Sequence, residues 1–289
     1  MAGYRFCRSD DAGLLVEAFN HCAASLEEPV EPLTDDAFKR LGRELDLWTS
    51  SCMVAQAQGE PIAVLLAAKR EEENLIHALV VHAEHQRQGH GRHLLTSLSQ
   101  KMAILGPPRL IAELPEERIV ACRFVEACGY RPEAVLTDFE HPGGGEPPGA
   151  EGALIVEVGW SELEQAGLLA STAARCWGRA IQTLRHRRDE LRGRAVLSER
   201  RVEAFLLDRP DRRGGVEIAA FGCAQPERAA PLAALLVRAL CARSEGPVRL
   251  PGAHPDELPF AVLSDLGFGP RERTVVYATE AVGREQASP

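Results

Sequence analysis

The sequence predicts an α/β fold with a mixed sheet, built as two tandem units of the same kind. Apolar runs of strand length alternate along the chain with stretches whose apolar residues recur at helical spacing. Past a stretch rich in glycine and proline, the same order of elements returns after about 140 residues, as expected for an internal repeat. That stretch disfavours both a helix and a central strand. We therefore expect domains at residues 1–143 and 153–289, joined by a linker at 144–152.

The first half is predicted to follow the order β-α-α-β-β-β-α-β-α-β. Thr34 or Asp35 can cap the second helix, Gly59 and Pro61 mark a turn between two strands, and Gly129 ends the last helix. The expected elements are a strand at 4–8, helices at 11–26 and 35–45, strands at 52–58, 62–69 and 75–82, a helix at 89–105, a strand at 109–114, a helix at 117–128 and further strands from 130.

The second half is predicted to repeat this order. Its last helix stops at Gly267-Phe268 before Pro270, just as the helix of the first half stops at Gly129-Tyr130 before Pro132. The expected elements are a strand at 153–158, one long helix at 161–191, strands at 194–199, 201–208 and 215–222, a helix at 227–243, a strand at 248–250, and the helix before Gly267 with a strand after it.

Composition and charge exclude several classes of protein. The net charge of −9 argues against a nucleic-acid-binding protein, whose affinity would come from a basic surface. The start of the chain has no apolar signal core and no run reaches roughly 18 apolar residues, so we expect a cytoplasmic protein without a membrane partner. The eight cysteines contain no Cys-x-x-Cys pair, and buried free thiols are expected rather than disulfides or a metal site.

The most informative stretch begins at Val81. A strand ends there, a turn with Gly89 and Gly91 follows, and a helix with leucines on one face begins. The first amides of a helix have no partner within it, and the helix dipole is positive at that end. Glycines let the backbone approach a diphosphate without an intervening Cβ, and Arg87 and Arg92 add positive charge. The stretch predicts an anion site, although it lacks the Gly-Lys-Ser/Thr of a Walker loop.

The segment Gln86-Arg-Gln-Gly89-His-Gly91 resembles the Gln/Arg-x-x-Gly-x-Gly/Ala signature of the GCN5-related N-acetyltransferase (GNAT) family. The resemblance implies that this loop holds the diphosphate of acetyl-CoA, the expected co-substrate. It also implies that backbone amides at the end of the preceding strand pair with the pantetheine arm. The cofactor-binding residues implied in this way are Leu79, Val80, Val81, Gln86, Arg87, Gln88, Gly89, His90, Gly91 and Arg92.

A second segment, Ala121 to Tyr130, resembles the family's Ala-x-x-Phe-Tyr-x-x-x-Gly-Phe motif, with two departures. Val125 stands where a tyrosine is usual, and Arg118 stands where an asparagine is common. In many relatives that tyrosine protonates the leaving thiolate, so this chain is expected to lack that acid.

The resemblance is close over residues 75–132 and weaker over 150–289. In the second half, the counterpart of the glycine loop contains no glycine, and Pro226 and Pro231 remove amide donors. The resemblance is therefore to tandem acetyltransferase-fold proteins in which the second unit has lost its phosphate cradle. We expect one acyl-CoA per chain.

Two side chains are candidates for the general base. Glu113 lies on the strand at 109–114, at the spacing before Gly129 where family members with a glutamate base often place it. His77 begins the string His77-Ala-Leu-Val-Val-His82, which is similar to arylalkylamine N-acetyltransferases, where a histidine at this point relays the proton. The alternatives are an exposed or capping glutamate and a satisfied core histidine.

Together these patterns predict an acyl-CoA-dependent N-acyltransferase that transfers an acetyl group directly to an amine of a small molecule or a peptide. The alternative is a non-catalytic acyl-CoA-binding or scaffold protein, which Val125 favours. The clustered histidines 77, 82, 85, 90 and 93 do not have the spacing of a metal site, and no metal is expected. The chain is expected to be either a monomer with pseudo-dimeric domains or a homodimer.

Overall fold

The structure is a computed structural model that describes residues 2–28, 30–145, 154–172, 174–198, 201–211 and 213–281. It contains two compact units that interleave along the chain. Unit 1 contains the residues up to Leu114, Arg118–Glu133 and the chain from Val275 onward, and unit 2 contains Pro115–Glu117 and Ala134–Thr274. The boundaries at 143 and 153 stay a prediction, since most of the expected linker lies outside the described residues.

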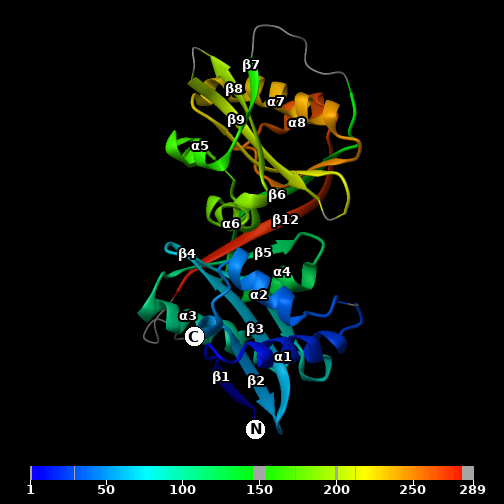
Figure 1. The fold of residues 1–289 in the computed structure, drawn as a ribbon. Helices are drawn as coiled ribbons and strands as arrows, with labels where there is room; N and C mark the ends of the chain where they lie inside the picture. The colour runs from blue at the N-terminus through cyan, green and yellow to red at the C-terminus, as the bar shows by residue number, and fades with distance from the viewer. Residues whose placement is uncertain are drawn as a thin grey trace. The chain divides into compact units, whose positions relative to one another are not determined.

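Unit 1 is an α/β layer structure around a sheet with strand order β1-β2-β3-β4-β5, followed by the end of β12 (Figure 1). The pairs from β1 to β4 are antiparallel and β4–β5 is parallel, so the predicted mixed sheet and the element order are confirmed. The elements are β1 (Gly3–Phe6), α1 (Ala12–Ala24), α2 (Asp35–Glu44), η1 (Thr49–Ser51), β2 (Met53–Ala57), β3 (Glu60–Lys69), β4 (Glu73–Val81), η2 (Ala83–His85), α3 (His90–Leu105), β5 (Arg109–Pro115), α4 (Ile119–Ala127) and the end of β12 (Gly269–Glu280).

The central strand of unit 1 is covered on both faces. β3 is buried from Ile62 to Ala68, the continuous apolar pattern expected of such a strand. α1 and α2 pack on one face, in a cluster that includes Ala78 and Val80 of β4, and Figure 1 shows α1 crossing this face. Leu79 lies between those two residues and approaches α3 instead, because successive strand side chains point to opposite faces.

A side-chain cap fixes the start of α2. The Thr34 hydroxyl accepts a hydrogen bond from the Ala37 amide at 3.1 Å, so Thr34 is the cap of the two predicted candidates. Such a cap is worth about 1 kcal/mol. α1 begins after Asp11, whose carboxylate instead accepts from the Arg8 amide and pairs with Arg5.

Unit 2 has its own sheet, with strand order β6-β11-β10-β9-β8-β7. α7 packs against β8, β9 and β10 around an apolar core that contains Leu232, Leu236 and Leu240. The elements are β6 (Arg131–His141), β7 (Leu154–Val158), α5 (Trp160–Gln165), η3 (Leu168–Ser171), η4 (Trp177–Arg179), α6 (Ile181–His186), η5 (Arg188–Glu190), β8 (Arg192–Ser198), β9 (Arg201–Pro210), β10 (Val216–Cys223), η6 (Pro226–Arg228), α7 (Ala229–Arg243), β11 (Val248–Ala253), α8 (Phe260–Asp265) and the start of β12.

The prediction of one long helix at 161–191 is wrong. The segment contains the short helices α5 and α6 and three 3-10 turns instead. Gly167 adopts a left-handed backbone (φ 69°) that ends the first helix, and Thr172 and Cys176 are extended. These bends turn Trp177 into the interior, where it is almost fully buried. Tertiary packing has overridden the helical spacing of the sequence.

The parallel strand pairs are short in both units, and the strands separate beyond them. β4 and β5 are in register only from Glu73–Arg109 to Leu75–Ile111. β10 and β11 are in register only at Val216–Val248 and the next residue pair. Each unit therefore has a gap between two diverging strands. In unit 2, Gly222 of β10 forms an isolated bridge with Thr172.

Candidate functional site

The glycine-bearing loop joins β4 to α3 and is braced by its own side chains. Gln86 and Gln88 donate their amide hydrogens to backbone carbonyls just before them in the chain, at 3.2 and 2.9 Å. Arg87 (φ 61°) and Gly89 (φ 88°) adopt left-handed backbone conformations, which bring the chain round into the first turn of α3. These hydrogen bonds and backbone conformations define one turn that leads directly into the start of α3.

The start of α3 presents unpaired backbone donors. Gly89 is the N-cap and provides no capping side chain. His93 is the first residue whose amide bonds back into the helix, to the Gly89 carbonyl at 3.0 Å, so the amides of His90, Gly91 and Arg92 have no acceptor within it. With the helix dipole and the exposed Arg87, these amides suit an anion.

Gly91 serves close packing as well as anion approach. A Cβ on Gly91 would lie 3.1 Å from Cζ of Phe124 and 3.6 Å from Cδ2 of Leu79. The missing side chain therefore lets α3 approach both α4 and β4. Around Gly89, by contrast, a Cβ would meet nothing within 4 Å, and its positive φ is what favours glycine there.

The two predicted catalytic residues lie where β4 and β5 separate. The parallel register ends with Leu75 opposite Ile111, and His77 and Glu113 each follow two residues later. His77 is also the extra residue of a β-bulge. On β3, Leu66 pairs with Ala78 and the next residue, Ala67, pairs with Ile76, so His77 has no partner on that strand. Bulges redirect side chains beside functional sites. The structure thus brings His77 and Glu113 to the same level of the gap.

The surroundings of His77 favour its neutral form. Its side chain is exposed to solvent, and the protein packed around its base still lowers the pKa of the imidazole below its usual value by desolvation. A neutral imidazole can accept a proton at neutral pH. Glu113 is half-buried on β5.

Comparison with known proteins identifies the first half of the chain. Residues 16–130 match the acetyltransferase (GNAT) family, and this match contains β4, the glycine loop, α3, β5 and α4. This part of the chain is therefore similar to GNAT acetyltransferases. No curated protein sequence matches the chain significantly.

Solved GNAT structures share the fold of the whole chain. A GCN5-related N-acetyltransferase from Sphaerobacter thermophilus is 16% identical, with a TM-score of 0.67, and the match covers 98% of this chain and 96% of that one. A tandem GNAT protein from the clavulanic acid biosynthesis pathway is 16% identical over 98% of this chain and 99% of its own, with a TM-score of 0.63. A putative acetyltransferase from Pyrococcus horikoshii is 15% identical over 97% and 90%, with a TM-score of 0.58. The chain therefore has a tandem GNAT fold.

The position of the usual GNAT tyrosine offers no acid. Val125 is buried in α4. Tyr277 of β12 lies beside α4, but its hydroxyl donates to the Glu126 carboxylate at 3.1 Å, and desolvation raises its pKa. Tyr130 is buried, with a raised pKa and no hydrogen-bond partner for its hydroxyl. Because the pKa of each phenol is raised, both tyrosines stay protonated. Neither has the lowered pKa that an efficient general acid needs.

Arg118, at the other departure from the GNAT motif, forms an ion pair that the sequence did not predict. It is the N-cap residue of α4 and lies 2.8 Å from the carboxylate of Glu28, in the loop between α1 and α2. Both side chains are more than half exposed, so the pair is worth at most about 1 kcal/mol. No local pattern links residues so far apart in sequence.

The corresponding gap of unit 2 is filled by the protein itself. Arg179 donates to the Ala219 carbonyl of β10 at 3.1 Å and to the Pro251 carbonyl of β11 at 3.0 Å. It also forms a two-pronged pair with Glu257, and both side chains are buried. The helix that follows β10 begins with Pro226 in a 3-10 turn rather than with a glycine loop. Unit 2 therefore lacks the glycine cradle, and the Arg179 side chain occupies its gap.

Replacing Arg179 by alanine is expected to destabilise unit 2 by about 3–5 kcal/mol, because Glu257 is left as an unpaired buried charge. Replacing both partners by apolar residues, as Arg179→Met with Glu257→Leu, should cost far less. Arg175→Ala is the matched control, since its pair with Asp256 is exposed and worth about 0–1 kcal/mol. Urea unfolding of the full chain measures all three, and equal losses for the single and double variants would contradict this account.

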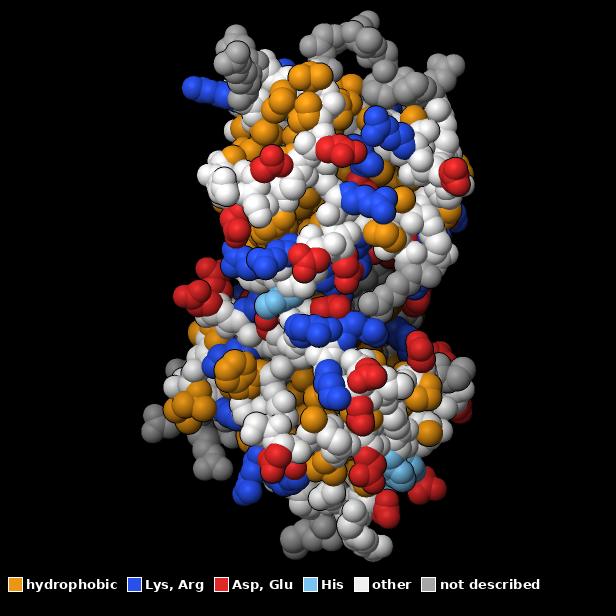
Figure 2. Space-filling view, in the orientation of Figure 1, with side chains coloured by type: hydrophobic (Ala, Val, Ile, Leu, Met, Phe, Trp, Pro, Cys, Tyr) orange, Lys and Arg blue, Asp and Glu red, His pale blue; other side chains and the backbone are white. Residues whose placement is uncertain are grey.

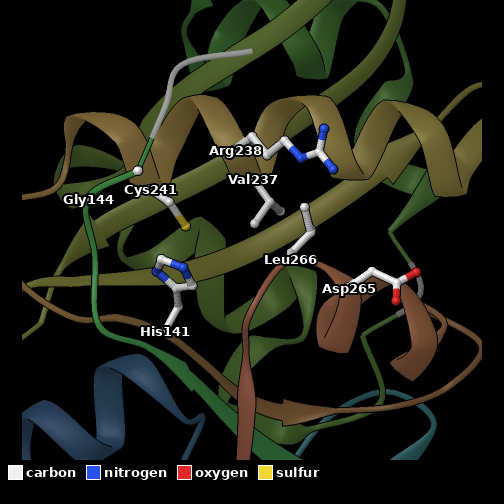
Figure 3. Close-up of a pocket in the computed structure, with 8 residues that line it drawn as sticks. His141, Gly144, Val237, Arg238, Cys241, Asp265 and Leu266 are labelled. Carbon is white, nitrogen blue, oxygen red and sulfur yellow. The ribbon is translucent and has the colours of Figure 1, made fainter.

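A cavity of about 190 Å³ in unit 2 is not a second cradle (Figure 3). Figure 3 shows the Cys241 sulfur pointing toward the His141 ring, beside the second half of α7 and away from its start. Burial raises the pKa of Cys241 to about 11, so the thiol is not nucleophilic, and His141 Nδ1 accepts from the Gly143 amide at 2.9 Å. The lining residues are His141, Gly144, Gly145, Val237, Arg238, Cys241, Asp265 and Leu266.

The described residues contain no cluster of three or more His, Cys, Asp or Glu side chains arranged to hold a metal ion. None of their helices has both the length and the apolar character needed to cross a membrane. All eight cysteines are free, as predicted, although Cys128, Cys176 and Cys223 are only half-buried.

Proposed function

We propose that the protein is an acyl-CoA-dependent N-acyltransferase whose active site lies in unit 1, with acetyl-CoA as the donor. One observation carries the proposal. Beside the gap between β4 and β5, the glycine loop presents unpaired amides at the start of α3, and His77 and Glu113 lie level with each other in that gap. The match of residues 16–130 to the acetyltransferase (GNAT) family supports the proposal, because this resemblance implies transfer of an acetyl group from acetyl-CoA to an amine.

The residues of the loop fit the donor. The amides from Arg87 to Arg92 would hold the diphosphate of acetyl-CoA, braced by Gln86 and Gln88, and the two arginines would add charge. Backbone groups of Leu79–Val81 on the free edge of β4 would pair with the pantetheine arm and polarise the thioester carbonyl. Binding energy is thus used to fix the reacting carbonyl in place, which supplies much of the rate.

The transfer is direct. The amine nitrogen attacks the carbonyl carbon, the carbon–sulfur bond breaks and the thiolate leaves, and the nitrogen gives its second proton to the thiolate or to solvent. Glu113, directly or through water, takes the proton from the ammonium form of the amine, and His77 is the second candidate for this role. The pKa of a thiol, about 8.5, makes the thiolate a tolerable leaving group without a dedicated acid.

The acceptor is an amine of a small molecule or a peptide. Five acidic residues of the loop before α2 and its first turn favour a cationic amine by electrostatic steering, an effect that falls with added salt. Glu28 is paired with Arg118 and Asp36 with Lys39, and acidic and basic side chains are interspersed on the face drawn in Figure 2. Steering must therefore come mainly from the other three carboxylates. The five residues are Glu27, Glu28, Glu31, Asp35 and Asp36. Activity confined to neutral acceptors, and insensitive to salt, would contradict steering.

In the proposed enzyme, unit 2 supports the active unit 1 and binds no donor of its own. Each chain therefore binds one acyl-CoA. The proposal includes a cytoplasmic protein without nucleic-acid or membrane partners, either monomeric or homodimeric. Titration calorimetry with acetyl-CoA should give one site per chain, because Arg179 fills the gap in unit 2. Two equal sites would contradict it.

Gly91→Asp is expected to weaken acetyl-CoA binding by about 100-fold, since the new carboxylate would lie between Phe124, Leu79 and the diphosphate. Gly13→Asp is the control, because a side chain at Gly13 on α1 would meet nothing within 4 Å. Calorimetry and thermal unfolding on both variants separate binding from stability. Unchanged affinity in the Gly91 variant would place the diphosphate elsewhere.

The alternative, a non-catalytic acyl-CoA-binding protein, is favoured by Val125 in the place of the usual tyrosine. Release of free CoA from acetyl-CoA over a panel of amines distinguishes the two. Saturable, amine-dependent release that Gly91→Asp abolishes supports the enzyme. Tight binding of acetyl-CoA without turnover on any amine class supports the alternative.

A further inference from the structure

A row of aromatic rings, most of them imidazoles, follows the glycine loop of unit 1. Successive ring centroids are 5.2, 5.8, 6.0, 5.9 and 3.8 Å apart. In order, the rings belong to His21, His82, His85, His90, Tyr4 and His93. The row connects the end of α1, the turn after β4, the first turn of α3 and β1. Five titratable imidazoles thus lie around the loop that has the unpaired amides.

His90 is the best-defined member of the row. It is the first residue of α3 and is buried, and its Nδ1 lies 2.6 Å from the Tyr4 hydroxyl. The imidazole is therefore held in one orientation at the positive end of the helix. Tyr4 faces it from β1, His85 from the turn and His93 from α3 itself.

The other charges in this segment are mostly positive. Arg87 and Arg92 lie in the loop and first turn of α3, and Glu84 is the carboxylate of the η2 turn. Burial, and then His85 and His93, lower the pKa of His90. In the free protein at neutral pH this imidazole is therefore neutral.

We propose that this row takes up a proton when acyl-CoA binds, so that His90, with His85, strengthens the hold on the diphosphate at lower pH. The proposal rests on the function proposed above. A diphosphate on the amides of α3 would bring negative charge beside the row and favour the imidazolium form. The proton comes from solvent and is returned when the ligand leaves.

The direction of the pH dependence follows from linkage. A bound anion raises the pKa of an adjacent imidazole, so the complex holds more protons than the free protein between the two pKa values. Affinity is then highest at low pH and falls as pH rises through this window. One fully coupled imidazole changes Kd by up to about tenfold per pH unit.

The experiment measures dephospho-CoA binding to the full chain by titration calorimetry from pH 6 to 8, in buffers of different ionisation enthalpy. Dephospho-CoA lacks the 3′-phosphate, whose second pKa of about 6 would otherwise titrate in the same range. We expect net proton uptake near pH 6.5, and a Kd that rises by about tenfold between pH 6 and 8.

Two variants connect this uptake to the row. His90→Gln keeps an acceptor for the Tyr4 hydroxyl but cannot take a proton. His85→Gln removes the titratable group from the half-buried turn. Relative to wild type, both should lose more affinity at pH 6 than at pH 8, with less proton uptake. A purely structural defect would weaken binding equally at both pH values. His254→Gln in unit 2 is the matched control and should keep the wild-type profile.

The outcomes separate this proposal from the one on which it rests. Binding without proton uptake, or an unchanged pH slope in both variants, would overturn the role of the imidazoles and leave the acyl-CoA site intact. Failure of the wild-type protein to bind either acetyl-CoA or dephospho-CoA would overturn the site itself.

Discussion

A chain that ends at Pro148 is expected to aggregate rather than to fold as a free acetyltransferase domain. The segment Val275–Glu280 of β12 belongs to unit 1 and lies next to β5 in its sheet. Val275 and Val276 are buried there, and removing two such side chains costs about 3–6 kcal/mol. Since domains are stable by only about 5–15 kcal/mol, this loss removes much of the stability of unit 1.

Truncation would also create a new sheet edge. Without β12, the backbone groups of β5 on that side have no partner, and an exposed apolar edge strand promotes aggregation. Tyr277 would no longer donate to Glu126 of α4. Soluble yield, far-UV circular dichroism and gel filtration measure the effect.

A matched control distinguishes a missing strand from a missing unit. Residues 274–281 can be appended to the truncated chain through a flexible glycine–serine linker. This chain should recover solubility and a cooperative unfolding transition, and a version with Val275→Asp and Val276→Asp should not. A chain ending at Pro148 that is monomeric, stable and fully active would show that unit 1 does not need β12.

The sequence predicted unit 1 well because its signals are local. The buried strand β3 is an unbroken apolar run, Thr34 provides the cap of α2, and Gly129 ends the α4 segment with a φ of 94°. Each signal acts within a few residues of where it appears. The glycine turn before α3 could be predicted for the same reason, since glycines within a few residues of one another mark it.

Contacts between distant parts of the sequence could not be predicted. Nothing near Val275 indicates that it packs in the same unit as the start of the chain. Arg179 lay within a predicted helix, and only the structure shows it between β10 and β11. The Tyr4–His90 contact joins residues 86 positions apart.

The structure gives Gly91 a packing role that the motif did not indicate. The motif predicts a glycine that lets the backbone approach a diphosphate. In the structure the space beside Gly91 is also taken by the ring of Phe124. The loop is therefore formed partly by α4, and its geometry depends on a side chain outside the motif.

Glu113→Gln is expected to lower kcat/KM at neutral pH by about 10- to 1000-fold, the range of a general base. The protonated amine has no lone pair and cannot attack, so removing its proton is the step that most needs help. The thiolate, in contrast, leaves without an acid, as Val125 in the place of the tyrosine requires. His77→Ala should have a smaller effect, although His77 lies level with Glu113 across the gap.

The pH–rate profile of each variant tests this assignment. Raising the pH should partly restore the Glu113→Gln variant, because solvent then deprotonates more of the amine before it binds. Glu117→Gln, at an exposed carboxylate four residues further along, is the control and should match wild type. Acetyl-CoA affinity should be the same in all of them, since the loss lies in proton transfer rather than in donor binding. Equal activity of the Glu113 variant and wild type at every pH would remove Glu113 as the base. If His77→Ala is unaffected as well, the amine must reach the site already neutral.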